Sequence, residues 1–155
     1  MAEAAVIAWL ATHAPDLARI EHSRSTATVA EAAEVLGVVP ARIAKTLAFR
    51  VGEAAMLLVT QGDARLDNSK CKAELGGRPR MLSADETLAL TGHALGGVCP
   101  FGLTTDPPIV ADRSLLNWPT VFPAAGSQTS SVELEPQRLA KLVGARWVDI
   151  CKLPE

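Results

Sequence analysis

The chain has 155 residues, of which 48% are apolar and 21% charged, and its formal net charge is −2. This size and composition indicate one globular domain and exclude a disordered chain, and no apolar run approaches the roughly 20 residues of a membrane-spanning helix. The first residues are acidic and lack the basic start of a secretory signal. We therefore expect a single domain over residues 1–155 that is located in the cytoplasm and has no membrane partner.

The cysteines and histidines are few and widely spaced: Cys71, Cys99, Cys151, His13, His22 and His93. They form no Cys-x-x-Cys pair and do not fall at the spacing of metal ligands. We expect reduced thiols, no disulfide framework, no metal site and no cofactor.

The first half of the chain alternates helix signals with strand signals. Apolar residues predict a helix over residues 3–12, and the Thr-x-x-Glu pattern of Thr28 and Glu31 predicts a second helix that stops at Gly37. A short helical turn opens at Pro40. Two apolar, β-branched runs follow, and Gly52-Glu53 between them indicates a hairpin of residues 46–51 and 54–61.

The second half continues in the same mixed manner. Asp67 caps a helix over residues 68–75, and Ser83 and Glu86 form another capping box for a helix that ends at Gly92. Short strands are expected at residues 108–111, 120–123 and 130–134. A last helix is expected at 136–143 and a final strand at 145–150. Helices mixed with hairpin-connected strands predict the α+β class, with a mixed or mainly antiparallel sheet.

The charge is unevenly distributed. Between Arg42 and Arg80 there are eight basic and four acidic residues, a net charge of +4, while the rest of the chain carries −6. Two interpretations stay open: solvated faces that differ by chance, or a local surface that binds the phosphates at one end of a nucleic acid.

The segment Gly92–Leu103 contains four glycines and Pro100. Such a loop lets another molecule approach the backbone, and its N–H groups can surround an anion or a developing oxyanion. The alternative is an ordinary connector. Lys45, at the start of an apolar strand, is either a lysine that reaches to water or a cation in a partly dry pocket that acts on a bound ester or phosphate.

Several short segments occur in the order found in one known family: Ile43-Ala44-Lys45-Thr46-Leu47, Leu66-Asp67 with Lys70, Leu75-Gly76, Gly96-Gly97-Val98-Cys99-Pro100-Phe101-Gly102, Asp112, Ala124-Ala125-Gly126 and Val132-Glu133-Leu134. Through them the chain resembles the YbaK and prolyl-tRNA-synthetase-associated domain family over roughly residues 20–150. The resemblance implies a barrel-like sheet surrounded by helices. It also implies a free-standing, trans-editing aminoacyl-tRNA deacylase, which hydrolyses the ester of mischarged tRNA.

The implied substrate is tRNA(Pro) that carries a small wrong amino acid: alanine, serine, threonine, cysteine or 2-aminobutyrate. Cys99 stands where related proteins often carry serine or proline. The segment Ala124–Thr129 differs from the version found in the cysteine-specific deacylases, which leaves cysteine open as a substrate. The implied partners are the acceptor end of tRNA and, transiently, prolyl-tRNA synthetase, with no DNA.

The resemblance also assigns residues to roles. The catalytic positions are Lys45, Gly96 and Gly97. The substrate-binding positions are Val98, Cys99, Pro100, Phe101, Gly102, Ala125, Gly126 and Ser127, and the tRNA-binding positions are Lys70, Lys72 and Arg80. The loop would hold the ester or the amino acid through backbone groups, while Lys45 would bind the terminal phosphate or polarise the ester. A pocket that admits small side chains and excludes proline would act as a second sieve.

Other interpretations remain. Cys99 could be a nucleophile with His93 as its base, or a small residue packed in the pocket wall. Asp112 could cap a helical turn or order the loop beneath the site. The whole chain could be a tRNA- or synthetase-binding module without catalysis, whereas a sequence-specific DNA-binding protein is disfavoured because no helix is rich in Arg, Asn or Gln.

Overall fold

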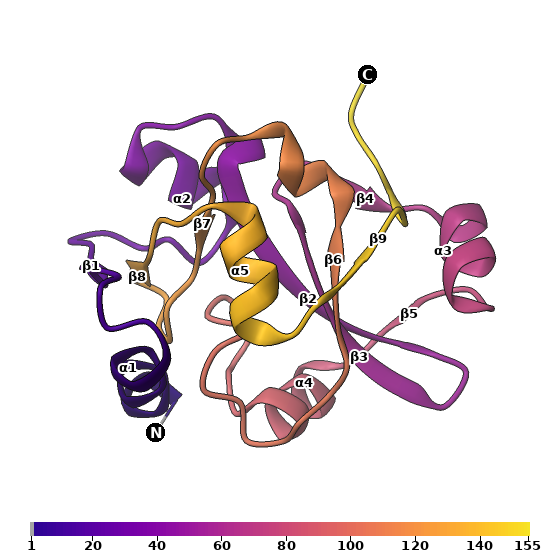
Figure 1. Ribbon diagram of the computed structural model, residues 1–155, viewed down its shortest axis with the longest axis horizontal. Helices are drawn as coiled ribbons and strands as arrows, with labels where there is room; N and C mark the ends of the chain where they lie inside the picture. Colours follow the sequence, from indigo (N-terminus) through magenta and orange to yellow (C-terminus); the bar gives the residue numbers. More distant parts are fainter. Residues whose placement is uncertain (1) are drawn as a thin grey trace.

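The computed structural model describes residues 2–155 (Figure 1). The helices are α1 (Ala2–His13), α2 (Val29–Leu36), α3 (Asn68–Leu75), α4 (Ala84–Thr91) and α5 (Pro136–Val143), with 3-10 turns η1 (Pro40–Arg42) and η2 (Arg113–Asn117). The strands are β1 (Ile20–Glu21), β2 (Ile43–Val51), β3 (Ala54–Gln61), β4 (Arg65–Leu66), β5 (Arg80–Met81), β6 (Ile109–Asp112), β7 (Phe122–Pro123), β8 (Ser130–Ser131), β9 (Arg146–Val148) and β10 (Cys151–Lys152). None of the helices in this part of the chain combines the length and the hydropathy needed to cross a bilayer.

The helix starts and stops follow local capping chemistry. The Thr28 hydroxyl accepts a hydrogen bond from the Glu31 N–H, Ser83 does the same for Glu86, and both capping boxes are complete. Asp67 accepts from the Lys70 N–H at the start of α3. These hydrogen bonds satisfy N–H groups that the first helical turn leaves free, so the predicted starts of α2, α3 and α4 are confirmed.

The strands differ more from expectation. β2 begins three residues before the predicted 46, and the strands expected at 120–123 and 130–134 shrink to β7 and β8. The last predicted strand, 145–150, shortens to β9, and β10 lies beyond the predicted range. At the junction of β9 and β10 the carboxylate of Asp112 accepts hydrogen bonds from the N–H groups of Ile150 (2.9 Å) and Cys151 (3.1 Å). The same carboxylate caps η2 through the Ser114 N–H (3.0 Å), which confirms the capping interpretation.

The main sheet is mixed. Its strands follow the order β5-β2-β3-β6-β9, and β7 also pairs with β2. β2 pairs antiparallel with β3 and β5, whereas β6 is parallel to β3 and β9. Within residues 2–155 the outer strands β5 and β9 do not pair with each other, so the sheet is open. The predicted α+β class with a mixed sheet is confirmed.

The sheet buries both of its faces. One face, formed by Ala44 and Ala48 of β2 and Leu57 and Val59 of β3, packs against α1, α5 and the glycine-rich segment. The opposite face carries Phe49 and packs against α3 and the end of the chain. Figure 1 shows α1 and α2 at one end of the sheet and α3 at the other.

One stretch of β2 has an uncovered edge. β7 pairs with Ile43 and Ala44, and β5 pairs with Phe49 and Arg50. The Ala48 carbonyl accepts a hydrogen bond from the Leu82 N–H on this edge (3.0 Å). Because hydrogen-bonding direction alternates along a strand, the backbone N–H and C=O of Thr46 point to the same edge, in the gap between β7 and β5.

Candidate functional site

A pocket of about 250 Å³ lies over the uncovered edge of β2. Four parts of the chain enclose it: the strand itself, α2 with the residues before it, the glycine-rich loop, and residues at and near β7 and β8. Its lining residues are Thr26, Ala27, Thr28, Val29, Ala32, Leu36, Ile43, Ala44, Lys45, Thr46, Leu47, Leu95, Gly96, Val98, Phe122, Ala124 and Ser131. We call it the edge pocket.

A second pocket, of about 350 Å³, begins where the edge pocket ends. It lies between β2, the start of α3 and the segment before β5, and its lining residues are Lys45, Leu47, Ala64, Arg65, Leu66, Asn68, Pro79 and Met81. Lys45 and Leu47 line both pockets. A molecule that occupied both would therefore pass directly over Lys45.

The ammonium group of Lys45 is held in place by a turn at the end of β3. Its Nζ donates a hydrogen bond to the Ala64 carbonyl oxygen (2.5 Å). Burial lowers the pKa of Lys45 below its ordinary value of 10.5; the negative charge of Asp63 opposes this shift and the positive charge of Arg65 adds to it. A cation with reduced hydration acts more strongly on a nearby phosphate or ester than a cation in water.

Gly96 brings the glycine-rich loop close to the pocket. Its φ is +89°, a conformation that favours glycine. A Cβ there would lie 2.8 Å from the Gln128 side-chain nitrogen and 3.2 Å from the Ala27 Cβ. Gly97, by contrast, packs on the backbone of Ser127, where a Cβ would be 3.4 Å from the nearest atom.

Hydrogen bonds fix the loop from both sides. The Gln128 side chain donates to the Leu95 carbonyl (3.1 Å), and the Gly97 N–H donates to the Ala94 carbonyl (3.1 Å). Within residues 2–155 the N–H groups of Gly96 and Val98 have no acceptor. Because both residues line the edge pocket, these N–H groups are donors that the loop can offer to a bound carbonyl or oxyanion.

His93 supports the loop from beneath. Its Nε2 lies 2.8 Å from the Phe101 carbonyl oxygen, and since a carbonyl only accepts, Nε2 carries the proton. The Cys99 sulfur is 3.5 Å from the same nitrogen, which therefore has no lone pair to receive the thiol proton. Cys99 is fully buried, and burial raises its pKa to about 12. These features are those of a packed thiol and not of an activated nucleophile.

The structure gathers some of the sequence-predicted residues at the edge pocket and places others beneath or behind it. Lys45, Gly96 and Val98 line it, whereas Cys99, Phe101 and Ala125 are buried in the core behind the loop. Gly126 packs against α1, where a Cβ would meet the Val6 side chain at 2.9 Å, and the Ser127 hydroxyl bonds with that of Ser130 (2.7 Å).

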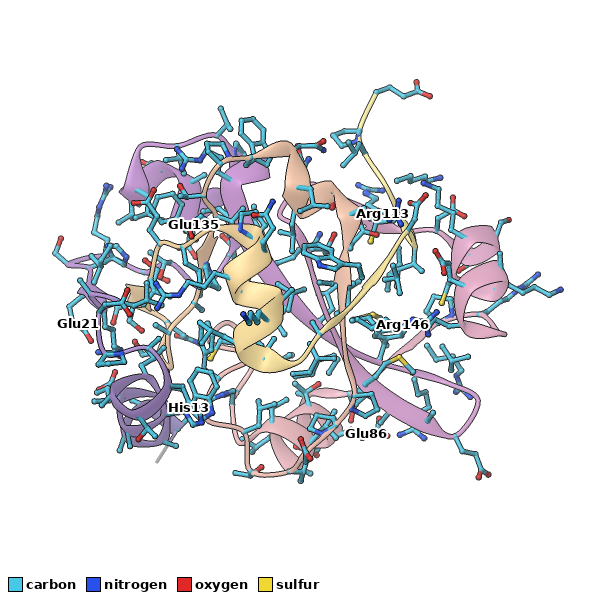
Figure 2. All side chains as sticks on the ribbon, viewed as in Figure 1. His13, Glu21, Glu86, Arg113, Glu135 and Arg146 are labelled. Carbon is cyan, nitrogen blue, oxygen red and sulfur yellow. The ribbon has the colours of Figure 1, made fainter. Side chains whose placement is uncertain are left out.

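Pro100 and Gly102 line a different pocket, of about 390 Å³, between α1, α5 and the loop that precedes β6. Trp9 and His13 of α1 form one wall, with their rings stacked 4.3 Å apart. Figure 2 shows His13 at this end of α1. These two loop residues therefore do not contact the edge pocket.

The three basic residues predicted to bind tRNA do not share one surface. Lys70 of α3 pairs with Asp149 (3.0 Å) and also donates to the Cys151 carbonyl (2.8 Å), while Lys72 is exposed on the same helix. Arg80 pairs in register with Arg50, whose guanidinium contacts Glu86 (2.6 Å), on the face of the sheet opposite to Lys45. In Figure 2, Glu86 projects from α4, far from α3.

Sequence reasoning assigned no role to Thr46 or to the start of α2, yet both line the edge pocket. A hydroxyl residue inside the apolar run Ile43–Phe49 was the available signal for Thr46. Residues 2–155 contain no group of three or more His, Cys, Asp or Glu side chains that could hold a metal ion.

Comparisons with known proteins identify the family of the chain. Residues 23–142 match the model of the aminoacyl-tRNA editing domain. The uncharacterized protein YwhH of Bacillus subtilis is 48% identical over 134 residues, which cover 85% of each protein. The proline–tRNA ligase of Thermotoga maritima is 35% identical over 89 residues, 57% of this chain and 15% of the ligase.

Solved structures extend the similarity to nearly the whole chain. The crystal structure of a candidate trans-editing enzyme for prolyl tRNA synthetase has a TM-score of 0.88 at 34% identity and covers 97% of both chains. The hypothetical protein APE2540 has a TM-score of 0.87 at 32% identity, covering 96% of this chain and 99% of its own. The protein therefore belongs to the family of aminoacyl-tRNA editing domains.

Proposed function

We propose that the protein is a trans-editing aminoacyl-tRNA deacylase that hydrolyses the ester of mischarged tRNA, with tRNA(Pro) carrying a small wrong amino acid as its substrate. The observation that carries this proposal is the position of Lys45. Its side chain lies where two pockets meet, at the uncovered edge of β2 and beside the glycine-rich loop. An aminoacyl-tRNA end also has two parts, an amino acid and a terminal adenosine, joined by the ester that is to be cut.

The sizes of the pockets suit this division. The edge pocket, at about 250 Å³, is below the range of about 300–1,000 Å³ typical of sites for drug-sized ligands, so an aminoacyl group fits it better than a nucleotide. The larger pocket on the far side of Lys45 is left for the adenosine. In this arrangement the ester lies over Lys45 and faces Gly96.

The chemistry requires a water molecule and stabilisation of the negative charge that develops on the carbonyl oxygen. The water adds to the carbonyl carbon, the bond to the ribose oxygen breaks, and that oxygen receives a proton, giving a free amino acid and a tRNA hydroxyl. The N–H groups of Gly96 and Val98 would stabilise the oxyanion. Lys45 would act as a cation, on the ester or on the terminal phosphate, and not as a base.

The apolar end of the edge pocket provides the second sieve. Val29 and Leu36 of α2 and Phe122 of β7 limit the space around the bound side chain. The pocket would admit alanine, serine, threonine, cysteine or 2-aminobutyrate, while the ring of proline would be excluded by shape. The similarity to proline–tRNA ligases favours a transient complex with that enzyme in the cytoplasm.

The test is a deacylation assay with purified protein and tRNA(Pro) charged with each of these amino acids and with proline. We expect hydrolysis of at least one mischarged species and protection of prolyl-tRNA(Pro). The competing function is a module that binds tRNA or the synthetase without turnover. Tight binding of mischarged tRNA(Pro) with no hydrolysis above the spontaneous rate, for every amino acid in the panel, would favour that module.

A further inference from the structure

We propose that the side-chain hydroxyl of Thr46 selects substrates whose own side chain carries a hydroxyl, so that seryl and threonyl esters are preferred over alanyl and 2-aminobutyryl esters. The inference rests on the proposed deacylase function and names the substrate class of the same pocket.

The hydroxyl of Thr46 is buried and has no hydrogen-bond partner within residues 2–155. The other hydroxyl residues that line the edge pocket are engaged. Thr26 donates to the Gln128 carbonyl (3.1 Å), Thr28 caps α2, and Ser131 bonds with His22 (2.7 Å). Thr46 is thus the member of this group whose hydroxyl has no partner in the described chain.

The surroundings of this hydroxyl are apolar. On the same face of the sheet its neighbours along β2 are Ala44 and Ala48, and its partner across the sheet is Val59. Ala44 also lines the edge pocket, and the side chains of these neighbours provide no polar atom. A buried hydroxyl without a partner is unfavourable, so a ligand that supplies one is stabilised relative to a ligand that does not.

The backbone of Thr46 and its side chain serve different parts of a substrate. The N–H and C=O at the uncovered edge can bind groups that every aminoacyl ester contains, namely the α-ammonium and the ester. The side chain lies on the core-facing side of β2, and the variable part of the substrate would bind on that side. A serine hydroxyl can donate to it or accept from it, whereas the methyl group of 2-aminobutyrate, which has nearly the same shape, can do neither.

The experiment measures kcat/KM for seryl- and 2-aminobutyryl-tRNA(Pro) with the wild type, Thr46→Val and Thr46→Ser. Valine has nearly the shape of threonine and suits a strand, so Thr46→Val should fold normally. We expect the wild type to prefer the seryl ester by on the order of 10- to 100-fold, and Thr46→Val to reduce this ratio to about one. Thr46→Ser keeps the hydroxyl and should keep most of the preference.

Two results would overturn the proposal. In one, Thr46→Val lowers both reactions by the same factor, which would mean that the hydroxyl binds a group common to all substrates. In the other, the ratio is the same in the wild type and in Thr46→Val.

A second measurement separates this inference from the proposed function. Seryl and 2-aminobutyryl groups are linked to 3′-amino-adenosine through an amide, which the protein need not cleave, and their dissociation constants are measured by calorimetry. A preference for the seryl analogue that disappears in Thr46→Val supports the role of Thr46 even if no ester is hydrolysed. Equal affinities of the wild type for both analogues would refute it, whatever the deacylation assay shows.

Discussion

The ammonium group of Lys45 donates its hydrogen bond to the backbone carbonyl of Ala64, 19 residues further along the chain. The turn that presents this carbonyl is closed by a hydrogen bond from the Ala64 N–H to the Gln61 carbonyl (2.9 Å). Gly62 allows the turn to pack closely, since a Cβ there would lie 2.4 Å from the Pro40 carbonyl oxygen. The position of the cation between the two pockets is therefore set by the backbone, which leaves its remaining N–H groups free for a substrate.

Replacing Lys45 with alanine should reduce kcat/KM for mischarged tRNA(Pro) by on the order of 100-fold or more, because the variant has no cation next to the ester. The fold should persist, since Lys45 makes no ion pair with another residue of the described chain. Lys141→Ala, an exposed change on α5, is the matched control and should keep full activity. Wild-type rates for Lys45→Ala would place the reaction elsewhere.

The pH dependence of ligand binding should reveal the buried setting of Lys45. Burial lowers its pKa below 10.5, so Lys45 becomes neutral in the folded protein at a lower pH than in the unfolded chain. Cys151 nearby has a pKa raised to about 12 by burial and stays neutral in this range. Binding of the amide-linked analogues should weaken as the pH rises through the lowered pKa. In Lys45→Arg, which stays charged, this decline should be absent.

The lowered pKa of Lys45 affects folding stability in the opposite direction to ligand binding. Between the pKa of Lys45 in the folded protein and 10.5, the unfolded chain binds more protons than the folded protein. The contribution of Lys45 to the free energy of unfolding therefore increases with pH in this interval. In denaturant titrations, the free energy of unfolding of the wild type minus that of Lys45→Met should therefore increase with pH in this interval. A difference that is constant with pH would show that Lys45 is fully hydrated.

Gly96 and Gly97 should respond differently to alanine. At Gly96 the new methyl would push the Gln128 side chain off the Leu95 carbonyl, and the positive φ would be strained by roughly 1–2 kcal/mol. We expect Gly96→Ala to lose most activity, with partial recovery in the double variant with Gln128→Ala. Gly97→Ala meets only ordinary contacts and should lose little. Equal rates for both single variants would reduce the loop to a connector.

The parts of the fold that the sequence predicted are those set by neighbours in the chain. The capping residues Thr28, Asp67 and Ser83 act within three residues, and their helices begin where expected. The edge of β2 depends instead on β5 and β7, which join it from about 30 and 80 residues away. No local pattern shows that their pairing stops on either side of Thr46. For the same reason the sequence could not place Arg80 on the face opposite to Lys45.

Cys99 tests whether a thiol takes part in the reaction. Since it is fully buried and its pKa is raised to about 12, Cys99→Ala should keep most of the deacylase activity and lose about 1–2 kcal/mol of stability from the vacated space. In the native protein, iodoacetamide should alkylate it only as fast as the chain unfolds, as mass spectrometry of the modified peptide can measure. Complete loss of activity in a folded Cys99→Ala would restore the nucleophile interpretation.

The last prediction concerns which basic residues hold the RNA. Arg65 lines the pocket assigned to the adenosine, and Lys72 lies one helical turn beyond Asn68, another residue of that lining, so both are exposed beside the path of the acceptor end. Arg80 lies on the other face of the sheet, near Glu86. Charge reversal of Arg65 and Lys72 should raise KM for charged tRNA more than it lowers kcat, because interactions with phosphates stabilise the ground state and the transition state alike.

Each of the two reversals should also reduce the slope of log K against log salt by about one, because each removes one cation that neutralises a phosphate. Arg80→Glu is the matched control: it changes the net charge of the chain as each single reversal does, but away from the pocket. Lys70→Glu is a poor probe, because it also breaks the hydrogen bonds to Asp149 and to the Cys151 carbonyl. If Arg80→Glu raises KM as much as Arg65→Glu and Lys72→Glu, the effect comes from the net charge of the protein and not from a path beside Lys45. An unchanged KM and salt slope in all three variants would show that binding depends on the pockets alone.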